Sequence, residues 1–153
     1  MAMAAPGCWI GVAAAAHVRV GREQGFVMFA HGKHSAVEQL RPGDAFAYYS
    51  PTETLGGKDA VRRFTAIGVI ADSAPEPSMM MGGEVEAWSR RARYLDAQEA
   101  DIYLLLPQLG FVTDQSHWGM YFRKSLFKTS TADFSLIAEA MGVGQFFQLG
   151  DQQ

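Results

Sequence analysis

Residues 48–58, with the sequence YYSPTETLGGK, combine two aromatic rings, a hydroxyl group and a proline with a lysine at the end of a glycine-containing loop. Aromatic rings present flat faces on which a nucleic-acid base can stack, and polar groups beside them can hydrogen-bond to the edge of the base. A lysine on such a loop can contact a phosphate. This stretch therefore predicts one wall of a pocket for a flat ligand, with Lys58 on its flexible rim.

Other large aromatic residues also stand at the ends of predicted strands or beside glycine, serine or proline: Trp9, Trp88, Trp118, Tyr121 and Phe122. Basic residues occur close to them in the sequence: His31, Lys33, Arg90 and Arg123. Any one large aromatic residue is more simply explained as part of a core. As a set with basic neighbours, however, these residues favour a pocket that stacks a base and hydrogen-bonds to its edge.

The sequence gives little support for metal binding or catalysis. Only His31 and His34 are close together among the histidines, and no acidic residue stands at ligand spacing from them. Ser50, His31 and Asp44 supply the residue types of a hydrolase triad, but no nucleophile elbow surrounds the serine. The GGK sequence at residues 56–58 lacks the preceding strand and following helix of a phosphate-binding loop. We therefore expect no enzyme, no metal and no cofactor.

The composition indicates one folded domain in a reducing compartment. Of the 153 residues, 48% are apolar and 12% are aromatic, levels that disordered chains do not reach. A formal net charge of −3 means that any contact with nucleic acid must be local. Cys8 is the only cysteine, which excludes an internal disulfide. With no recognisable signal peptide or membrane segment, we expect a cytoplasmic protein with no membrane association.

Hydrophobic patterns predict a series of short strands, at residues 8–13, 44–50, 63–72, 84–95 and 121–128. Residues 25–32 predict a further strand, which is apolar on both alternating faces and is therefore expected at the centre of a sheet. In the strand at 84–95, Trp88 and Arg90 share a face that can line a pocket.

Short helices are predicted between and after these strands. The first follows residue 13 and ends at Gly25, and a single turn follows with Ser35 as its N-cap. Residues 102–109 predict a helix interrupted by proline, and residues 131–142 predict a helix with Thr131 as its N-cap. Five to seven strands with three or four short helices predict an α+β fold, namely a closed or nearly closed β-barrel with helices over its openings.

Several motifs, taken in order, resemble the EVE domain family of the PUA-like superfamily: CWIGVA (8–13), HGK (31–33), RPGD followed by YYSP (48–51), FTAIG (64–68), WGMYFR (118–123) and DFSLIAEAMG (133–142). The resemblance implies a single domain over residues 1–153 with a core at about 8–142. It also implies a PUA-like twisted β-barrel with short helices covering its openings. The family is associated with pockets that take in an extruded, modified base of DNA or RNA.

Carried over by position, the resemblance implies a base-binding pocket formed by Trp9, His17, Tyr49, Ser50, Pro51, Trp118, Phe122 and Arg123. Ser50 and backbone groups would read the edge of the base. The pocket rim, or contacts with phosphate, would be supplied by His31, Lys33, Lys58, Trp88 and Arg90. The chain departs from the family pattern at residues 79–83 (MMMGG) and at the expected arginine pair, which reads as Ser89-Arg90 or Arg90-Arg91.

These observations lead to one functional hypothesis with alternatives from other classes. The leading hypothesis is a non-catalytic nucleic-acid-binding module that recognises a modified base, such as a modified cytosine in DNA, by base flipping. Stacking in an aromatic pocket returns about 1–3 kcal/mol toward the cost of extruding the base. The alternatives are an RNA-binding PUA-like module, an enzyme or binder acting on a small nucleotide-like ligand through His17, His31 or Ser50, and a scaffold with a vestigial pocket.

Overall fold

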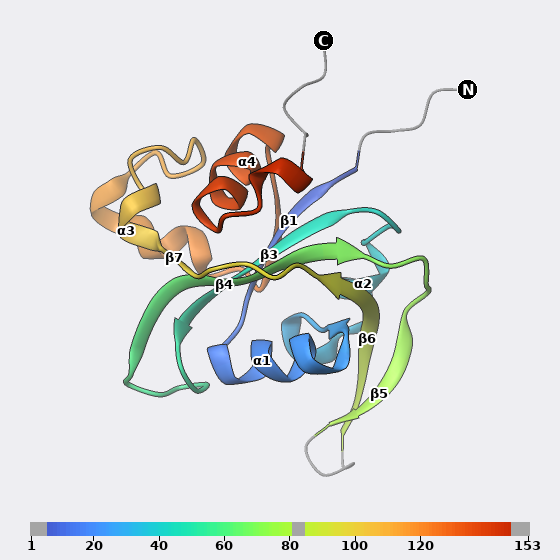
Figure 1. Ribbon diagram of the computed structural model, residues 1–153. Helices are drawn as coiled ribbons and strands as arrows, with labels where there is room; N and C mark the ends of the chain where they lie inside the picture. Colours follow the sequence, from blue (N-terminus) through green and yellow to red (C-terminus); the bar gives the residue numbers. More distant parts are fainter. Residues whose placement is uncertain (1–5, 81–84, 148–153) are drawn as a thin grey trace.

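The computed structural model describes residues 6–80 and 85–147, which form a curled, half-barrel sheet with short helices against it (Figure 1). Its strands are β1 (Cys8–Val12), β2 (Phe26–Val27), β3 (Ala45–Thr52), β4 (Ala60–Ile70), β5 (Glu76–Met80), β6 (Val85–Tyr94), β7 (Ala100–Asp101) and β8 (Leu126–Thr129). The sheet order is β2-β6-β4-β3-β1-β8, with β5 paired to β6 and β7 paired to β4. Strands β1 and β3 are parallel, whereas β1 and β8, and β3 and β4, are antiparallel.

The helices are α1 (Ala15–Gln24), α2 (His34–Glu38), α3 (Ile102–Leu105) and α4 (Thr131–Ala140), with 3-10 helices η1 (Ala30–Gly32), η3 (Gln115–Phe122) and η4 (Gly144–Phe146). Helices α1 and α2 lie on one side of the sheet, and α3 and α4 lie on the other (Figure 1). The predicted α+β class is therefore confirmed.

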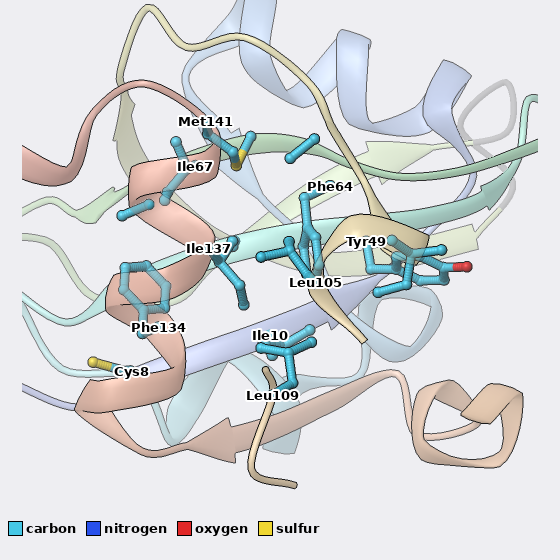
Figure 2. Close-up of a cluster of buried hydrophobic side chains, with 14 of the residues drawn as sticks. Cys8, Ile10, Tyr49, Phe64, Ile67, Leu105, Leu109, Phe134, Ile137 and Met141 are labelled. Carbon is cyan, nitrogen blue, oxygen red and sulfur yellow. The ribbon is translucent and has the colours of Figure 1, made fainter. Parts of the chain in front are cut away.

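Both faces of the central strands are buried. Successive side chains of a strand point to opposite faces, so neighbouring residues belong to different cores. Ile10 and Tyr49 belong to a core on the side of α3 and α4, which we call the α4-side core (Figure 2). Trp9 and Tyr48, their immediate neighbours in sequence, belong to a second core under α1 and α2, the α1-side core. This two-sided burial explains why the sequence of β4 is apolar on both faces.

The sequence correctly predicted the strands β1, β3, β4 and β6 and the helices α1 and α4. Helix α1 ends as predicted at Gly25, whose φ of 76° lies in the left-handed region that glycine adopts readily. The prediction of a central strand at residues 25–32 is wrong, since β2 has two residues and lies at one end of the sheet order. After β2 the backbone of Met28 bonds a side chain instead of a strand: the Tyr48 hydroxyl accepts its N–H at 3.2 Å and donates to its C=O at 3.0 Å.

Three local predictions are also corrected. Helix α2 begins at His34 with Lys33 as its N-cap, so Ser35 is not the cap. The cap of α4 is Ser130 instead of Thr131, and the Ser130 side chain accepts the N–H of Asp133 at 3.1 Å. The first two residues of the predicted strand at 121–128 belong to η3, which begins after its N-cap Asp114 and is kinked at His117, so the strand β8 begins only at Leu126.

Candidate functional site

A hollow of about 270 Å³ opens where the end of β3, the start of β4 and η3 meet. We call it the aromatic hollow, and it is lined by Tyr49, Pro51, Arg62, Trp118, Gly119 and Phe122. All of these except Arg62 come from the YYSP and WGMYFR motifs, which are far apart in sequence. The fold thus brings together YYSP and WGMYFR, the two motifs from which the sequence predicted a pocket.

The aromatic side chains of the hollow form a floor and a wall. Phe122 stacks on Tyr49 with ring centroids 4.2 Å apart, and both residues are buried in the α4-side core. Trp118 stands edge-on to Tyr49, at 6.4 Å and 90°, and is only partly buried. The Trp118 ring is therefore the aromatic surface best placed to contact a bound flat ligand.

The hydroxyl of Tyr49 has no hydrogen-bond partner among the residues that the structure describes. The side chain is 2% exposed, and its oxygen points away from the other labelled residues of the α4-side core (Figure 2). Burial raises the pKa of this hydroxyl above its ordinary value of about 10, at which it is already protonated at neutral pH. The oxygen is not among the described buried polar atoms that lack a partner, so it reaches the surface of the hollow, where a ligand or water can bond it.

Arg62 lies at a β-bulge between β3 and β4, next to the hollow. The strands pair at Ser50 with Arg63 and at Thr52 with Ala60, so that one residue of β3, Pro51, opposes two residues of β4. Proline has no N–H to donate to the strand ladder and is therefore found at such irregularities. Bulges bend a strand and re-aim a side chain, often beside functional sites. Here the bulge places Arg62 among the lining residues.

Sequence reasoning missed Arg62, because its position depends on a strand register that the sequence does not reveal. Its φ of 52° lies in the left-handed region, which is uncommon for a residue with a bulky side chain. The guanidinium donates a hydrogen bond to the Tyr103 hydroxyl at 2.9 Å. Pro51 was the one signal in the sequence for an irregularity at this point.

Ser50 does not line the hollow. A first bulge, between the pairs Tyr48 with Ala66 and Tyr49 with Phe64, leaves Thr65 as the extra residue. The Ser50 hydroxyl is fully buried and pairs with the Thr65 hydroxyl at 2.7 Å. It is therefore not placed to read the edge of a base in this hollow.

Trp9 lies on the opposite face of the sheet from the hollow, in the α1-side core. Its indole N–H donates to the Asp44 carboxylate at 2.9 Å, and that carboxylate also accepts the N–H groups of Gly7 and Arg41. The Lys128 ammonium lies 5.4 Å from the centre of the indole ring, a cation–π contact. The structure thus assigns Trp9 to a buried network rather than to the wall of the hollow.

Another group of the predicted site residues lies around α2 and β6. Lys33 is exposed and precedes α2, and Trp88 on β6 packs edge-on against His34 at 4.4 Å. The backbone of His31 belongs to η1, but its side chain lies outside what the structure describes. None of these residues lines the aromatic hollow.

Arg90 is buried and ties α2 to β6 instead of standing on a pocket rim. Its guanidinium donates to the carbonyl groups of Ser73 at 2.9 Å and Val37 at 3.0 Å, and to that of Leu40. Arginine side chains satisfy helix-end carbonyls well because the planar guanidinium has several donors. This use leaves Arg90 unavailable to a phosphate.

We expect the Arg90→Met variant to unfold more readily, because the carbonyl groups of Ser73 and Leu40 lose the Arg90 donor. The carbonyl group of Val37 loses it as well but keeps the N–H of Leu40. The expected loss of unfolding free energy is about 1–3 kcal/mol, the usual cost of leaving buried polar groups unsatisfied. Urea denaturation followed by circular dichroism measures it. Arg91→Met is the matched control: Arg91 is exposed and pairs with Glu76 at 3.2 Å, so its loss should cost about 1 kcal/mol at most. Equal effects of both variants would contradict the assignment.

The remaining predicted residues are separate from the hollow. His17 lies on α1, Lys58 is exposed in the loop between β3 and β4, and Arg123 is exposed immediately after η3. None of the three is a lining residue.

Beside Trp118, an exposed cluster unites Asp114, Ser116 and His117. His117 Nδ1 contacts both the Ser116 hydroxyl and the Asp114 carboxylate, each at 3.0 Å. Hydrogen bonds from Ser116 and His117 lower the pKa of Asp114. Because the same histidine nitrogen meets the serine and the acid, this is a helix cap and not a relay of the hydrolase type.

Two further findings concern the described part of the chain as a whole. Within residues 6–80 and 85–147, no group of three or more histidine, cysteine, aspartate or glutamate residues could hold a metal ion. No helix in the same ranges has the length and apolar character needed to cross a membrane.

The fold and the hollow define an α+β protein with a curled sheet and an aromatic-lined hollow at a bulged strand pair. Its fold is similar to that of two solved structures, protein Atu2648 from Agrobacterium tumefaciens and Rpa0253 from Rhodopseudomonas palustris. The TM-scores are 0.58 and 0.55, at 12% and 16% identity. The first comparison covers 90% of this chain and 94% of the other, and the second covers 89% and 93%.

No protein-family model matches the chain. It is 44% identical over 135 residues to UPF0310 protein msl3206 of Mesorhizobium japonicum, which covers 88% of this chain and 91% of that protein. It is 33% identical over 135 residues to UPF0310 protein YdcG of Bacillus subtilis, covering 88% and 92%. The chain therefore belongs to the UPF0310 family.

Proposed function

We propose that this UPF0310 protein is a non-catalytic nucleic-acid-binding module that takes an extruded, modified base, such as a modified cytosine, into the aromatic hollow. The observation that carries the proposal is the combination, in one hollow, of the accessible Trp118 ring, the unpartnered Tyr49 hydroxyl and the Arg62 guanidinium. Stacking surfaces with convergent hydrogen-bonding groups are what recognition of a single base requires.

The size of the hollow supports a ligand no larger than a single base. Ligand pockets usually enclose about 300–1,000 Å³. At about 270 Å³ the hollow lies just below that range, so a whole nucleotide would extend outside it. The sugar and phosphate of an extruded nucleotide would then remain at the surface.

An EVE-type, PUA-like classification forms part of this proposal. The motifs YYSP and WGMYFR, which carry the resemblance to that family, also supply most of the lining residues. A curled half-barrel sheet with short helices is compatible with such a fold.

The charge distribution supports base readout over general electrostatic binding. The net charge is −3, and Arg63, next to the hollow residue Arg62, is already paired with Glu99 at 3.3 Å. Few phosphate contacts imply a shallow dependence of affinity on salt.

The proposal is tested by fluorescence anisotropy with short labelled oligonucleotides that carry unmodified, methylated or hydroxymethylated cytosine at one position. Matched DNA and RNA are titrated at low and moderate salt. We expect one modified oligonucleotide to bind at least about fivefold more tightly than the others, equivalent to about 1 kcal/mol, and to keep this preference at moderate salt.

Other outcomes have defined meanings. A preference for RNA over DNA of the same sequence assigns the RNA-binding alternative, because the 2′-hydroxyl distinguishes the two. Equal and salt-labile binding to all oligonucleotides, or no binding, contradicts base readout. It would favour a small ligand that is not part of a nucleic acid.

A further inference from the structure

We propose that Arg62 is the specificity-determining residue of the aromatic hollow, and that it selects a base with two adjacent hydrogen-bond acceptors, as the carbonyl oxygen and ring nitrogen of cytosine provide. This inference rests on the proposed function, since it concerns the same hollow. It states which hydrogen-bonding edge of the base is recognised. The aromatic residues stack on the face of a base and do not distinguish one edge from another.

Arg62 differs from the neighbouring basic residues in being free to bind a ligand. It lines the hollow and forms no ion pair among the residues that the structure describes. Arg63 is the next residue on the same strand, but it pairs with Glu99 and does not line the hollow. Arg123 is exposed and lies outside the lining as well.

The backbone of Arg62 adopts a conformation that is uncommon for arginine. At φ of 52° a glycine or asparagine would be accommodated at lower cost than arginine. The bulge opposite Pro51 holds this conformation. Strained backbone is a recurrent feature of binding sites, and here it occurs at a residue that lines the hollow.

Tyr103 holds the Arg62 guanidinium through one hydrogen bond and leaves its other N–H groups available. Its hydroxyl accepts one hydrogen bond from Arg62 Nη1, and its ring packs edge-on against Trp118 at 5.5 Å. An arginine has five N–H donors, so the others remain for a ligand. Two parallel N–H donors match two adjacent acceptors, which is how arginine reads guanine in DNA grooves.

The edge of the base decides whether such a match is possible. Cytosine derivatives present O2 beside an unprotonated N3, whereas thymine and uracil carry a proton on N3 between their two carbonyl groups. 5-Methylcytosine and thymine share the pyrimidine skeleton, O2 and the 5-methyl group, and they differ at N3 and at C4, where thymine has a carbonyl oxygen in place of the amino group. They are therefore a matched pair of probes for Arg62.

The experiment measures the affinities of the protein for two oligonucleotides that differ only in carrying 5-methylcytosine or thymine at one unpaired position. We expect the wild type to prefer 5-methylcytosine by about tenfold or more. Arg62→Asn, which suits the left-handed backbone, should bring the ratio of affinities close to one. Arg63→Ala, which removes the same charge from the same strand, should leave the ratio unchanged. Tyr103→Phe should lower the ratio partway.

The outcomes separate this inference from the proposed function. If Arg62→Asn, or Arg62→Gly as a second variant, keeps its thermal stability and weakens binding of both probes by the same factor, Arg62 does not determine specificity. If the wild type shows no preference between the probes but loses affinity on Trp118→Ala, the hollow binds bases and only the role of Arg62 is overturned. If no oligonucleotide binds, the proposed function and this inference both fail.

Discussion

Replacing Trp9 with alanine is expected to lower the free energy of unfolding by about 3–5 kcal/mol, the range for deleting a large aromatic side chain from a core. Trp9 is 6% exposed and packs in the α1-side core. The substitution creates a cavity and removes the indole donor from the buried Asp44 carboxylate. Losses of this size are a large fraction of the total stability of a small domain.

Urea denaturation followed by far-ultraviolet circular dichroism measures this effect. Trp9→Phe keeps most of the ring volume and should lose less stability than Trp9→Ala, which separates the packing contribution from the hydrogen bond to Asp44. A Trp9→Ala loss below about 1 kcal/mol would mean that the side chain is not tightly packed, since core deletions cost more than this. Trp9 would then return as a candidate ligand contact.

Replacing Trp118 with alanine is expected to act mainly on binding. The ring is partly buried at the wall of the aromatic hollow, so its removal takes away a stacking surface more than a core element. Base stacking on an aromatic side chain contributes about 1–3 kcal/mol, and the dissociation constant for the preferred oligonucleotide should rise by about 5- to 150-fold. Anisotropy titration measures it, with thermal unfolding as the check on folding.

Met120→Ala provides the matched control for Trp118→Ala. Met120 lies on the same 3-10 helix and is 49% exposed, but it does not line the hollow. Its substitution should leave the dissociation constant unchanged. Equal weakening by both variants would point to a general disturbance of η3, and no weakening by Trp118→Ala would remove the hollow from the binding site.

Together, the variants of Trp9 and Trp118 distinguish two tryptophans that sequence reasoning placed in one pocket. The reason for the error is the period of two along a strand. Tyr49 and its pairing partner in β4, Phe64, face the α4-side core, whereas Trp9 faces the α1-side core. When a sheet is buried on both faces, hydrophobic alternation does not reveal which face a given aromatic residue occupies.

Local sequence determined those elements whose signals are local. Helix α1 ends at a glycine in the left-handed conformation, and the pattern Phe134, Ile137, Ala138 and Met141 places one face of α4 in the core. The strands β3 and β4 were recognisable from their β-branched and aromatic residues. The motifs YYSP and WGMYFR also indicated, without any structure, which aromatic residues line the hollow.

Only the tertiary structure decided which of these residues meet. Ser50 and Arg90 are polar residues in strands, and their sequence gives no sign that one pairs with Thr65 and the other with carbonyl groups near α2. Arg62 reaches the hollow because Pro51 displaces the register of β3 against β4 by one residue. Composition and periodicity determine local secondary structure, whereas hydrogen-bond partners and strand register depend on segments distant in sequence. The sequence thus predicted the aromatic residues of the hollow, whereas only the strand register of the folded protein showed that Arg62 lies beside them.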